Sequence, residues 1–186
     1  MKRTFNKIVL AAFFGSMITL ASCKKDDDTV ITNTVTDIVV NTANYSVLEE
    51  AVVKANLAAT LSGAGPFTVF APDNTAFAAA GINSATVASL SPTALSDLLL
   101  YHTIATKIPA ASVPAGPNAK VVTAGGDSVF VTSNAAGVFV NGIKVAEADI
   151  NADNGVIHRL SKALNKPSGN IVATAQTTGS GLDSLV

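Results

Sequence analysis

Several residue types are scarce in this chain of 186 residues. It has no tryptophan, one cysteine and two histidines, and only 13% of its residues are charged. A single cysteine excludes a disulfide within the chain. Twelve basic residues against thirteen acidic ones give a net charge of −1, so the chain lacks the basic surface that nucleic-acid binding requires. What is abundant is apolar: 48% of residues are hydrophobic, which is typical of a packed domain and not of a disordered chain.

The first 22 residues have the pattern of a bacterial lipoprotein signal peptide. Three basic residues among the first seven precede a short apolar core at 8–20, which is too short to span a bilayer as a mature helix. The core ends in Leu20-Ala21-Ser22-Cys23, which resembles the lipobox of bacterial lipoproteins, where the cysteine becomes the first mature residue and carries the lipid. We therefore expect lipidation of Cys23. The alternative is an ordinary signal peptide cleaved near Ser22 beside an incidental cysteine.

Residues 23–34 are expected to form a solvated tether between the lipid and the domain. They begin with Lys24-Lys25-Asp26-Asp27-Asp28, which resembles the export tag of surface-exposed lipoproteins in some Gram-negative bacteria. The alternative is a charge run that only keeps the linker disordered. We expect anchorage in the outer membrane of the cell envelope. The sequence pattern leaves two alternatives, a lipoprotein exposed at the surface and one in the inner leaflet.

Residues 35–166 are expected to form one domain that starts with helices. Ser46 and Glu49 have capping-box spacing, and a helix is predicted from there to about Leu61, ending at Gly63. An apolar β-rich run at 67–70 predicts a strand ending at Pro72. Asp73 is the expected N-cap of a short helix over 74–80. Four side chains of this stretch are the expected core contributors: Phe67, Val69, Phe70 and Phe77.

The second half of the domain is expected to turn from helix to strand. A short helical piece at 83–90 precedes a helix begun by Ser91-Pro92, with His102 on its leucine face. The β-rich runs that follow are 103–108, 120–123, 128–133, 138–145 and 155–164. Asn141-Gly142 lies between two β-rich arms and predicts a tight hairpin. Helices and strands are segregated after the first strand, which indicates an α+β fold.

Three stretches of the chain resemble the signature blocks of one family, the fasciclin domain. Phe67 to Phe77 (FTVFAPDNTAF) resembles its first block, with Phe70, Ala71, Pro72, Asp73 and Phe77 as motif positions. Leu100-Tyr101-His102 resembles its Tyr-His block. Asn154-Gly155-Val156-Ile157-His158 resembles its second block, with Asn154, Gly155 and His158 as motif positions. The resemblance covers roughly Val35 to Asn165.

The resemblance implies a compact β-wedge of antiparallel strands with several short helices packed on it. It also implies a surface or extracellular protein that acts in adhesion, matrix contact or protein and glycan binding, without an active site or a cofactor. The chain departs from the family at Thr75-Ala76, where the family often has an acidic residue, and at Arg159-Leu160, where it often has an apolar and then an acidic residue.

The candidate site residues are Tyr101 and His102. The Tyr-His block is linked to integrin adhesion in animal proteins that this chain resembles, so a receptor contact is one hypothesis. The other is core packing with a hydrogen bond from the phenol, which we favour in a bacterial protein. His102 and His158 are expected to be packed residues bonded to backbone groups.

No metal site or catalytic arrangement is predicted. The two histidines have no third ligand at a plausible spacing, and no serine lies in a nucleophile elbow. The acidic loop 149–155 resembles a calcium loop in its alternating oxygen ligands, but its glycine is at the seventh position and Leu160 occupies the twelfth. This loop is therefore predicted to be a turn into the closing strand.

Residues 167–186 are expected to be a linker and the start of a second, truncated copy of the domain. The segment 37–43 recurs loosely at 170–175, and 48–52 recurs at 182–186. The alternative is an amphipathic tail that docks on the domain. Together these patterns predict a non-enzymatic surface lipoprotein that binds an unknown protein or glycan. The alternative function is a structural spacer or accessory subunit of an envelope assembly.

Overall fold

The computed structural model describes residues 33–113 and 116–166. The lipidation candidate Cys23, most of the tether and the predicted second copy at 167–186 lie outside the described residues. The helices are α1 (Val35–Asn41), η1 (Ala43–Tyr45), α2 (Ser46–Lys54), α3 (Ala58–Leu61), α4 (Asn74–Ala79), α5 (Ser84–Ser89), α6 (Pro92–Tyr101) and η2 (Ala110–Ser112). The strands are β1 (Phe67–Pro72), β2 (Thr103–Ile104), β3 (Gly116–Val122), β4 (Ser128–Asn134), β5 (Gly137–Val140), β6 (Ile143–Ala152) and β7 (Gly155–Leu160).

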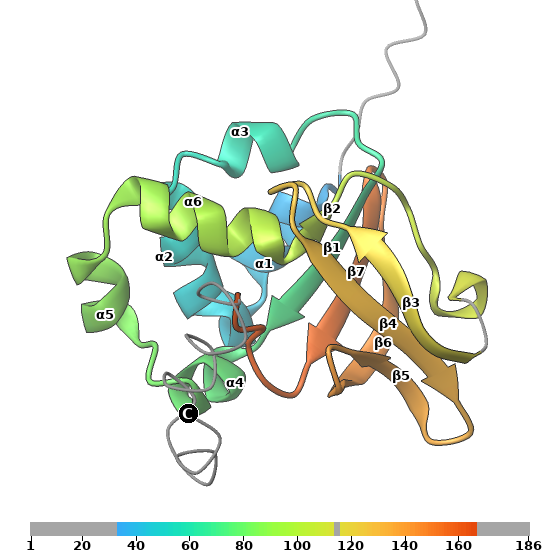
Figure 1. Cartoon of the computed structure of the whole chain (residues 1–186). Helices are drawn as coiled ribbons and strands as arrows, with labels where there is room; N and C mark the ends of the chain where they lie inside the picture. Colours follow the sequence, from blue (N-terminus) through green and yellow to red (C-terminus); the bar gives the residue numbers. More distant parts are fainter. Residues whose placement is uncertain (1–32, 114–115, 167–186) are drawn as a thin grey trace, which may run out of the picture. The chain divides into compact units, whose positions relative to one another are not determined.

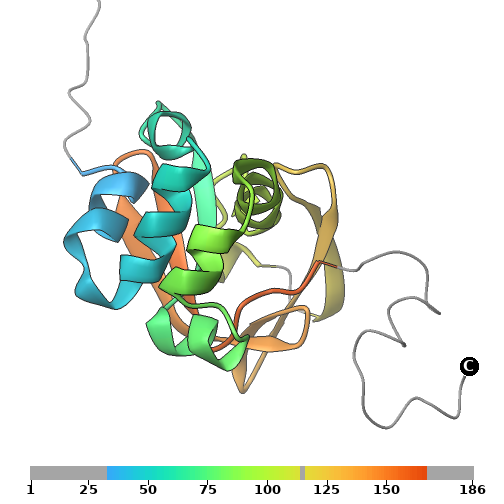
Figure 2. The same ribbon diagram turned by 90° about the vertical axis from the view of Figure 1, so that its left-hand side faces the viewer.

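The seven strands form one sheet in the order β2-β1-β7-β6-β5-β4-β3. The sheet folds over on itself, so that β3 and β4 lie in front of β1 and β7 (Figure 1). The helices gather on one side of the sheet, with α1, α2 and α6 next to it (Figures 1 and 2). This arrangement confirms the α+β prediction. Within the described residues no helix is long and apolar enough to cross a membrane.

One strand pairing differs from the expected antiparallel pattern. β1 and β7 run parallel, with Thr68 opposite Val156 and Phe70 opposite His158, while the other pairings are antiparallel. The first and second signature blocks are therefore neighbouring strands at the centre of the fold. Parallel pairing follows from the topology, since a long crossover of helices and strands separates the two strands in sequence.

The core consists of two clusters on opposite faces of β1 and β7. Val69 and Ala71 of β1 and Ile157 of β7 belong to the cluster covered by the helices. Phe70 and Leu160 belong to the second cluster, which lies between the two halves of the folded sheet. Alternation of side chains along a strand explains this division. The predicted core residues Val69, Phe70 and Phe77 are buried, whereas Phe67 is half-buried and packs at the edge of the first cluster.

The first helix begins eleven residues earlier than the sequence pattern suggested. Helix α1 starts at Val35 with a true capping box, in which Thr34 accepts from the Asp37 amide and Asp37 accepts from the Thr34 amide at 2.8 Å. The expected capping box at Ser46 and Glu49 does not form. Ser46 has helical dihedral angles (φ −58°, ψ −36°) because η1 runs directly into α2, and an N-cap needs an extended conformation.

The expected long helix from Ser46 to Leu61 is interrupted. α2 ends at Lys54, and Asn56 then adopts a left-handed conformation (φ 57°) before α3 begins at Ala58. The start of α2 is held by a distant residue, because the Asn74 side chain accepts from the Val47 amide at 3.1 Å. A tertiary contact therefore replaces the local cap.

The other predicted helix starts are confirmed. Asp73 accepts from the Ala76 amide at 2.8 Å and begins α4, and Ser91 accepts from the Ala94 amide with proline at the first position of α6. The short piece expected at 83–90 is α5, one residue shorter at each end. The helix expected over 74–80 ends at Ala79.

The strands are confirmed in position and corrected in length. The Asn141-Gly142 hairpin forms, with φ of 49° and 77° at these two residues, as a type I′ turn requires. The strand expected over 103–108 is shorter and consists only of β2. The residues after β2 bond to a side chain instead of a strand, because the Thr68 hydroxyl accepts from the Ile108 amide at 2.8 Å and donates to the Thr106 carbonyl. The final strand ends at Leu160 and not at 164.

Candidate binding site

The residues of the Tyr-His block are buried. Tyr101 is 1% exposed and His102 is 2% exposed, at the C-terminal end of α6. The Tyr101 hydroxyl accepts from the Asn141 amide at 2.9 Å, which ties α6 to the β5–β6 hairpin. Desolvation by burial raises the pKa of Tyr101. This packing favours the structural interpretation of Tyr101 over a direct contact with a receptor.

His102 joins two segments through both ring nitrogens. Nδ1 lies 2.8 Å from the Leu98 carbonyl oxygen, and Nε2 accepts from the Leu164 amide at 2.9 Å. This pairing requires the neutral tautomer with its proton on Nδ1. Burial lowers the pKa of His102 to about 4, so the ring is uncharged at neutral pH.

The second histidine is held in a similar way. His158 is 3% exposed, its Nε2 lies 2.9 Å from the Ile108 carbonyl oxygen, and its Nδ1 accepts from the Asp149 amide at 3.2 Å. Its ring stacks on Phe70 with the centroids 5.8 Å apart. Both histidines therefore have both nitrogens engaged with the backbone, and neither presents a nitrogen to a substrate.

Asn154 and Gly155 of the second block fix the backbone around β1. The Asn154 side chain accepts from the Val35 amide at 2.8 Å and donates to the carbonyls of Leu61 and Gly63, each at 2.7 Å. A Cβ atom on Gly155 would lie 2.4 Å from the carbonyl oxygen of Phe67. These two motif positions are therefore needed for close packing of the chain.

The acidic loop at 149–155 is used in structural contacts. The predicted turn over 149–155 is shorter than expected: residues up to Ala152 belong to β6, and only Asp153 and Asn154 form the turn that leads into β7. The Asp149 side chain accepts from the Ala110 amide at 2.9 Å, and Asp153 accepts from the Asn33 amide at 3.0 Å. Within residues 33–113 and 116–166 no three His, Cys, Asp or Glu side chains are grouped to hold a metal ion.

A charged cluster connects the two signature blocks. Arg159 lies 3.0 Å from Asp73 and 3.2 Å from Glu147. Partial burial raises the pKa of Asp73, but the hydrogen bonds that its carboxylate accepts outweigh this effect, and its pKa is lowered. The sequence showed Arg159 only as a departure from the family pattern. The available signal was its position directly after His158. Its partner in the first block follows only from the structure, where β7 pairs with β1 and places Arg159 opposite Ala71.

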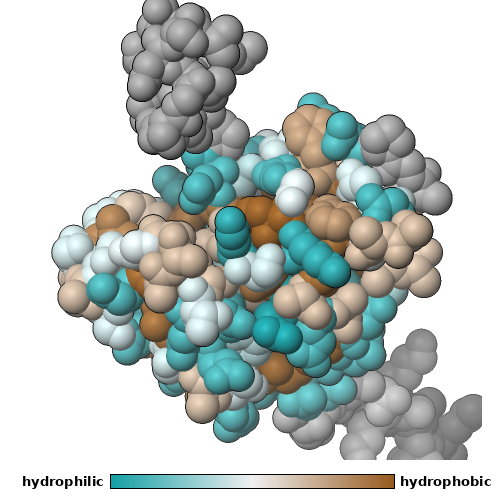
Figure 3. Space-filling model, turned by 90° about the horizontal axis from the view of Figure 1, so that it is seen from below, coloured by the Kyte–Doolittle hydropathy of each residue, from teal (hydrophilic) through white to brown (hydrophobic). Residues whose placement is uncertain are grey.

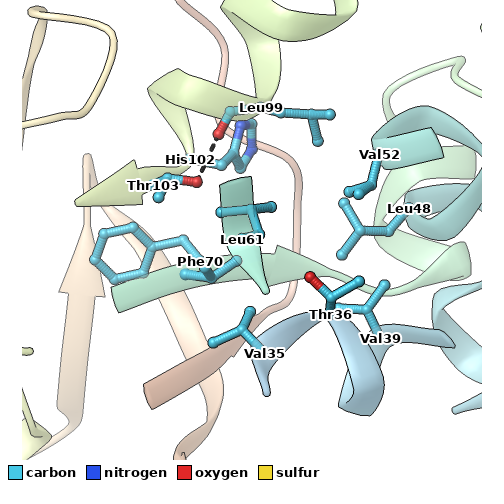
Figure 4. Close-up of a pocket in the computed structure, with 11 residues that line it drawn as sticks. Val35, Thr36, Val39, Leu48, Val52, Leu61, Phe70, Leu99, His102 and Thr103 are labelled. Carbon is cyan, nitrogen blue, oxygen red and sulfur yellow. Dashed lines mark hydrogen bonds between the residues drawn. The ribbon is translucent and has the colours of Figure 1, made fainter. Parts of the chain in front are cut away.

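The cavity shown in Figure 4 is small and internal. It has a volume of about 20 Å³ and is lined mainly by aliphatic side chains of α1, α2 and α6 together with His102 and Thr103. The polar groups are already paired, since the Thr103 hydroxyl donates to the Leu99 carbonyl at 2.9 Å (Figure 4). This space is a packing defect of the core and is not a ligand site.

Two larger pockets open to the surface. The apolar pocket has a volume of about 260 Å³ and is lined by Lys107, Ile108, Ser112, Val113, Val121 and Val131. The second, which we call the Tyr45 pocket, has a volume of about 360 Å³ and is lined by Ile38, Thr42, Asn44, Tyr45, Glu147, Ile150 and Arg159. On the face seen in Figure 3, apolar residues are visible among polar ones. Sequence reasoning missed both pockets.

Comparisons with known proteins agree with the signature blocks. The sequence profile of the Fasciclin domain matches residues 43–166. Protein sll1483 of Synechocystis sp. is 37% identical over 138 residues, which cover 72% of this chain and 74% of that protein. Transforming growth factor-beta-induced protein ig-h3 of Sus scrofa is 33% identical over 135 residues, covering 73% of this chain but only 20% of the pig protein.

Among solved structures, a FAS1 domain pair from the insect cell adhesion molecule Fasciclin I is similar to this chain. The match covers 76% of this chain and 48% of that one, with 18% identity and a TM-score of 0.42. Proteins with fasciclin domains are generally non-enzymatic and of the adhesion type. The profile match and the Synechocystis relative are sufficient for an assignment: the chain belongs to the fasciclin domain family.

Proposed function

We propose that this protein is a non-enzymatic surface lipoprotein whose fasciclin domain mediates adhesion by binding a protein or a glycan. The observation that carries the proposal is the use of the motif side chains. His102, His158 and Asn154 each satisfy backbone groups inside the fold, so the signature residues act as structural parts and not as a reactive centre. We therefore assign ligand binding to the surface of the domain, whose shape these buried residues maintain.

The relatives support the adhesion class. The chain belongs to the fasciclin domain family, and this family is associated with adhesion. A spacer or accessory subunit of an envelope assembly is the competing role. A spacer needs no ligand, whereas an adhesion module does.

The proposed anchor is a lipid on Cys23, with the protein held in the outer membrane and facing outward. The lipobox-like sequence Leu20-Ala21-Ser22-Cys23 and the lysine and aspartates after it support this part of the proposal. Substituting Cys23→Ser in the full chain should release the protein from the membrane fraction into the soluble fraction. Membrane association that survives this substitution would refute the lipid anchor.

A binding assay with the full chain tests the function. We expect the immobilised protein to capture specific proteins or glycans from a panel of surface components, and cells displaying it to adhere to a surface coated with the captured component. Neither capture nor adhesion, with the protein folded by circular dichroism, would favour the spacer role.

A separate variant tests the role of Tyr101. Tyr101→Phe removes the hydroxyl that Asn141 bonds and should lower the melting temperature with adhesion per folded molecule unchanged. Lost adhesion at an unchanged melting temperature would restore the contact hypothesis.

A further inference from the structure

The Tyr45 pocket has the size and wall composition of a small-ligand site. It lies between the α1–η1 segment, which contributes Thr42 and Asn44, and strands β6 and β7, which contribute Glu147 and Arg159. Its volume of about 360 Å³ falls in the range of about 300–1,000 Å³ found for ligand pockets. Segments more than a hundred residues apart in sequence therefore form one concave, mostly polar surface.

The Tyr45 hydroxyl has no partner among the described residues. Tyr45 is 3% exposed, yet none of the hydrogen bonds formed within residues 33–113 and 116–166 involves its phenol oxygen. Desolvation raises the pKa of this phenol, and Arg159 and Glu147 lie close enough to influence it. The phenol oxygen is not itself a buried unpaired atom, because it reaches the open space of the pocket that Tyr45 lines. The hydroxyl is therefore available to a ligand that can both donate and accept a hydrogen bond.

The charge of the pocket argues against an anion. The guanidinium of Arg159 is held by Asp73 at 3.0 Å and by Glu147 at 3.2 Å. The pocket wall itself carries one carboxylate, Glu147, and one guanidinium, Arg159, so its charges balance. Because the guanidinium is already paired with two carboxylates, its charge is compensated before a phosphate, sulfate or carboxylate group could use it. These contacts also fix the direction of Arg159 and Glu147, so the wall is ordered before a ligand arrives.

We propose that the Tyr45 pocket binds a neutral sugar residue of a glycan, an inference that rests on the binding function proposed above. Sugar hydroxyls donate and accept, which matches the phenol of Tyr45, the amide of Asn44 and the carboxylate of Glu147. The apolar C–H face of a pyranose matches the aliphatic side chains of Ile38 and Ile150, which line the same pocket. A neutral ligand also suits the net charge of the wall.

The test uses the full chain on an array of neutral oligosaccharides, with matched oligosaccharides that carry a uronic acid. We expect capture of neutral glycans and weaker capture of their acidic counterparts. Isothermal titration with the best neutral glycan then compares variants. Tyr45→Phe should weaken the affinity about three- to tenfold at an unchanged melting temperature, since no hydrogen bond of the protein is lost.

A matched pair of exposed asparagines provides the control. Asn44→Ala should weaken glycan binding, whereas Asn134→Ala, at the end of β4, should leave it unchanged. Glycan capture that Tyr45→Phe and Asn44→Ala do not alter would overturn the pocket and leave the adhesion function standing. Capture of proteins but of no glycan would also overturn the proposed glycan site in the Tyr45 pocket, and it would leave the adhesion function standing. A folded protein that binds neither class would remove the proposed function, and this inference with it.

Discussion

Acidification should destabilise the domain through His102 before its carboxylates are affected. In the folded state the ring is neutral, with Nε2 accepting from the Leu164 amide at 2.9 Å. Protonation would place an N–H against that amide N–H and would bury a charge. The pKa of about 4 in the folded state lies below the ordinary value of 6.5, so the unfolded chain binds the proton first as the pH falls.

The size of the effect follows from these two pKa values. Stability is full above pH 6.5 and is lost progressively as the pH falls toward 4. The linkage relation gives a loss of about 1 kcal/mol between pH 7 and pH 5.5, and of about 3 kcal/mol by pH 4. Asp37 and Asp73 have pKa values lowered from 3.8. Their stabilising contributions are present above that value, so the range above about pH 5 reports mainly on histidine.

Urea unfolding followed by circular dichroism at pH 7, 6 and 5.5 measures this loss. His102→Gln removes the titrating ring, and it should be less stable at pH 7 but should lack this part of the pH dependence. We compare the slopes of the free energy of unfolding against pH for the native chain and for His102→Gln. Their difference isolates His102, because the contributions of the other titrating groups are common to both proteins. An NMR titration in which the His102 ring protonates near pH 6.5 in the folded protein, or equal slopes for the two proteins, would refute the reasoning.

Four further substitutions, two of them paired with a control, test the packing. Asn154→Ala leaves buried backbone groups without partners and should lower the free energy of unfolding by about 2–5 kcal/mol, measured by urea titration; a loss below 1 kcal/mol would contradict the assigned bonds. Gly155→Ala forces a contact of 2.4 Å with backbone and should abolish the cooperative thermal transition. Gly125→Ala, whose nearest atom lies at 3.4 Å, should preserve that transition and serves as its control. Phe70→Ala should cost about 3–5 kcal/mol, since Phe70 is 3% exposed; a cost near zero would show that it is not core. Asp73→Ala should cost about 0.5–2 kcal/mol for the lost cap, and Asp73→Asn should retain most of the cap while losing the ion pair, so equal costs would contradict the assigned cap.

The sequence predicted those parts of the fold that depend on local chemistry. The Asp73 cap, the Ser91-Pro92 helix start and the Asn141-Gly142 hairpin each rest on a few adjacent residues whose conformational preferences agree with the fold. The same capping-box spacing, however, is present at Thr34–Asp37 and at Ser46–Glu49. Only the first forms, because the chain before Ser46 is already helical.

The Tyr45 pocket could not be predicted because its two walls meet only through the sheet. Tyr45 lies in η1 and Glu147 lies in β6, and no local pattern relates them. The register of β6 on β7 shifts on both sides of Glu147, so even a correct strand assignment would not have placed this side chain. Such irregularities depend on long-range packing and leave no periodic signal in the sequence.

The position of β7 in the sheet determines when the domain can fold. Among residues 33–113 and 116–166, β7 is the last strand in sequence but lies between β1 and β6 in the sheet, so it joins two sets of strands that do not otherwise pair with each other. A chain that ends before Gly155 would leave β1 and β6 with exposed edges, and such edges pair with other chains. Synthesis must therefore pass Leu160 before the sheet can close. A nascent chain stalled before this strand keeps those edges unpaired and becomes a substrate for chaperones or for aggregation.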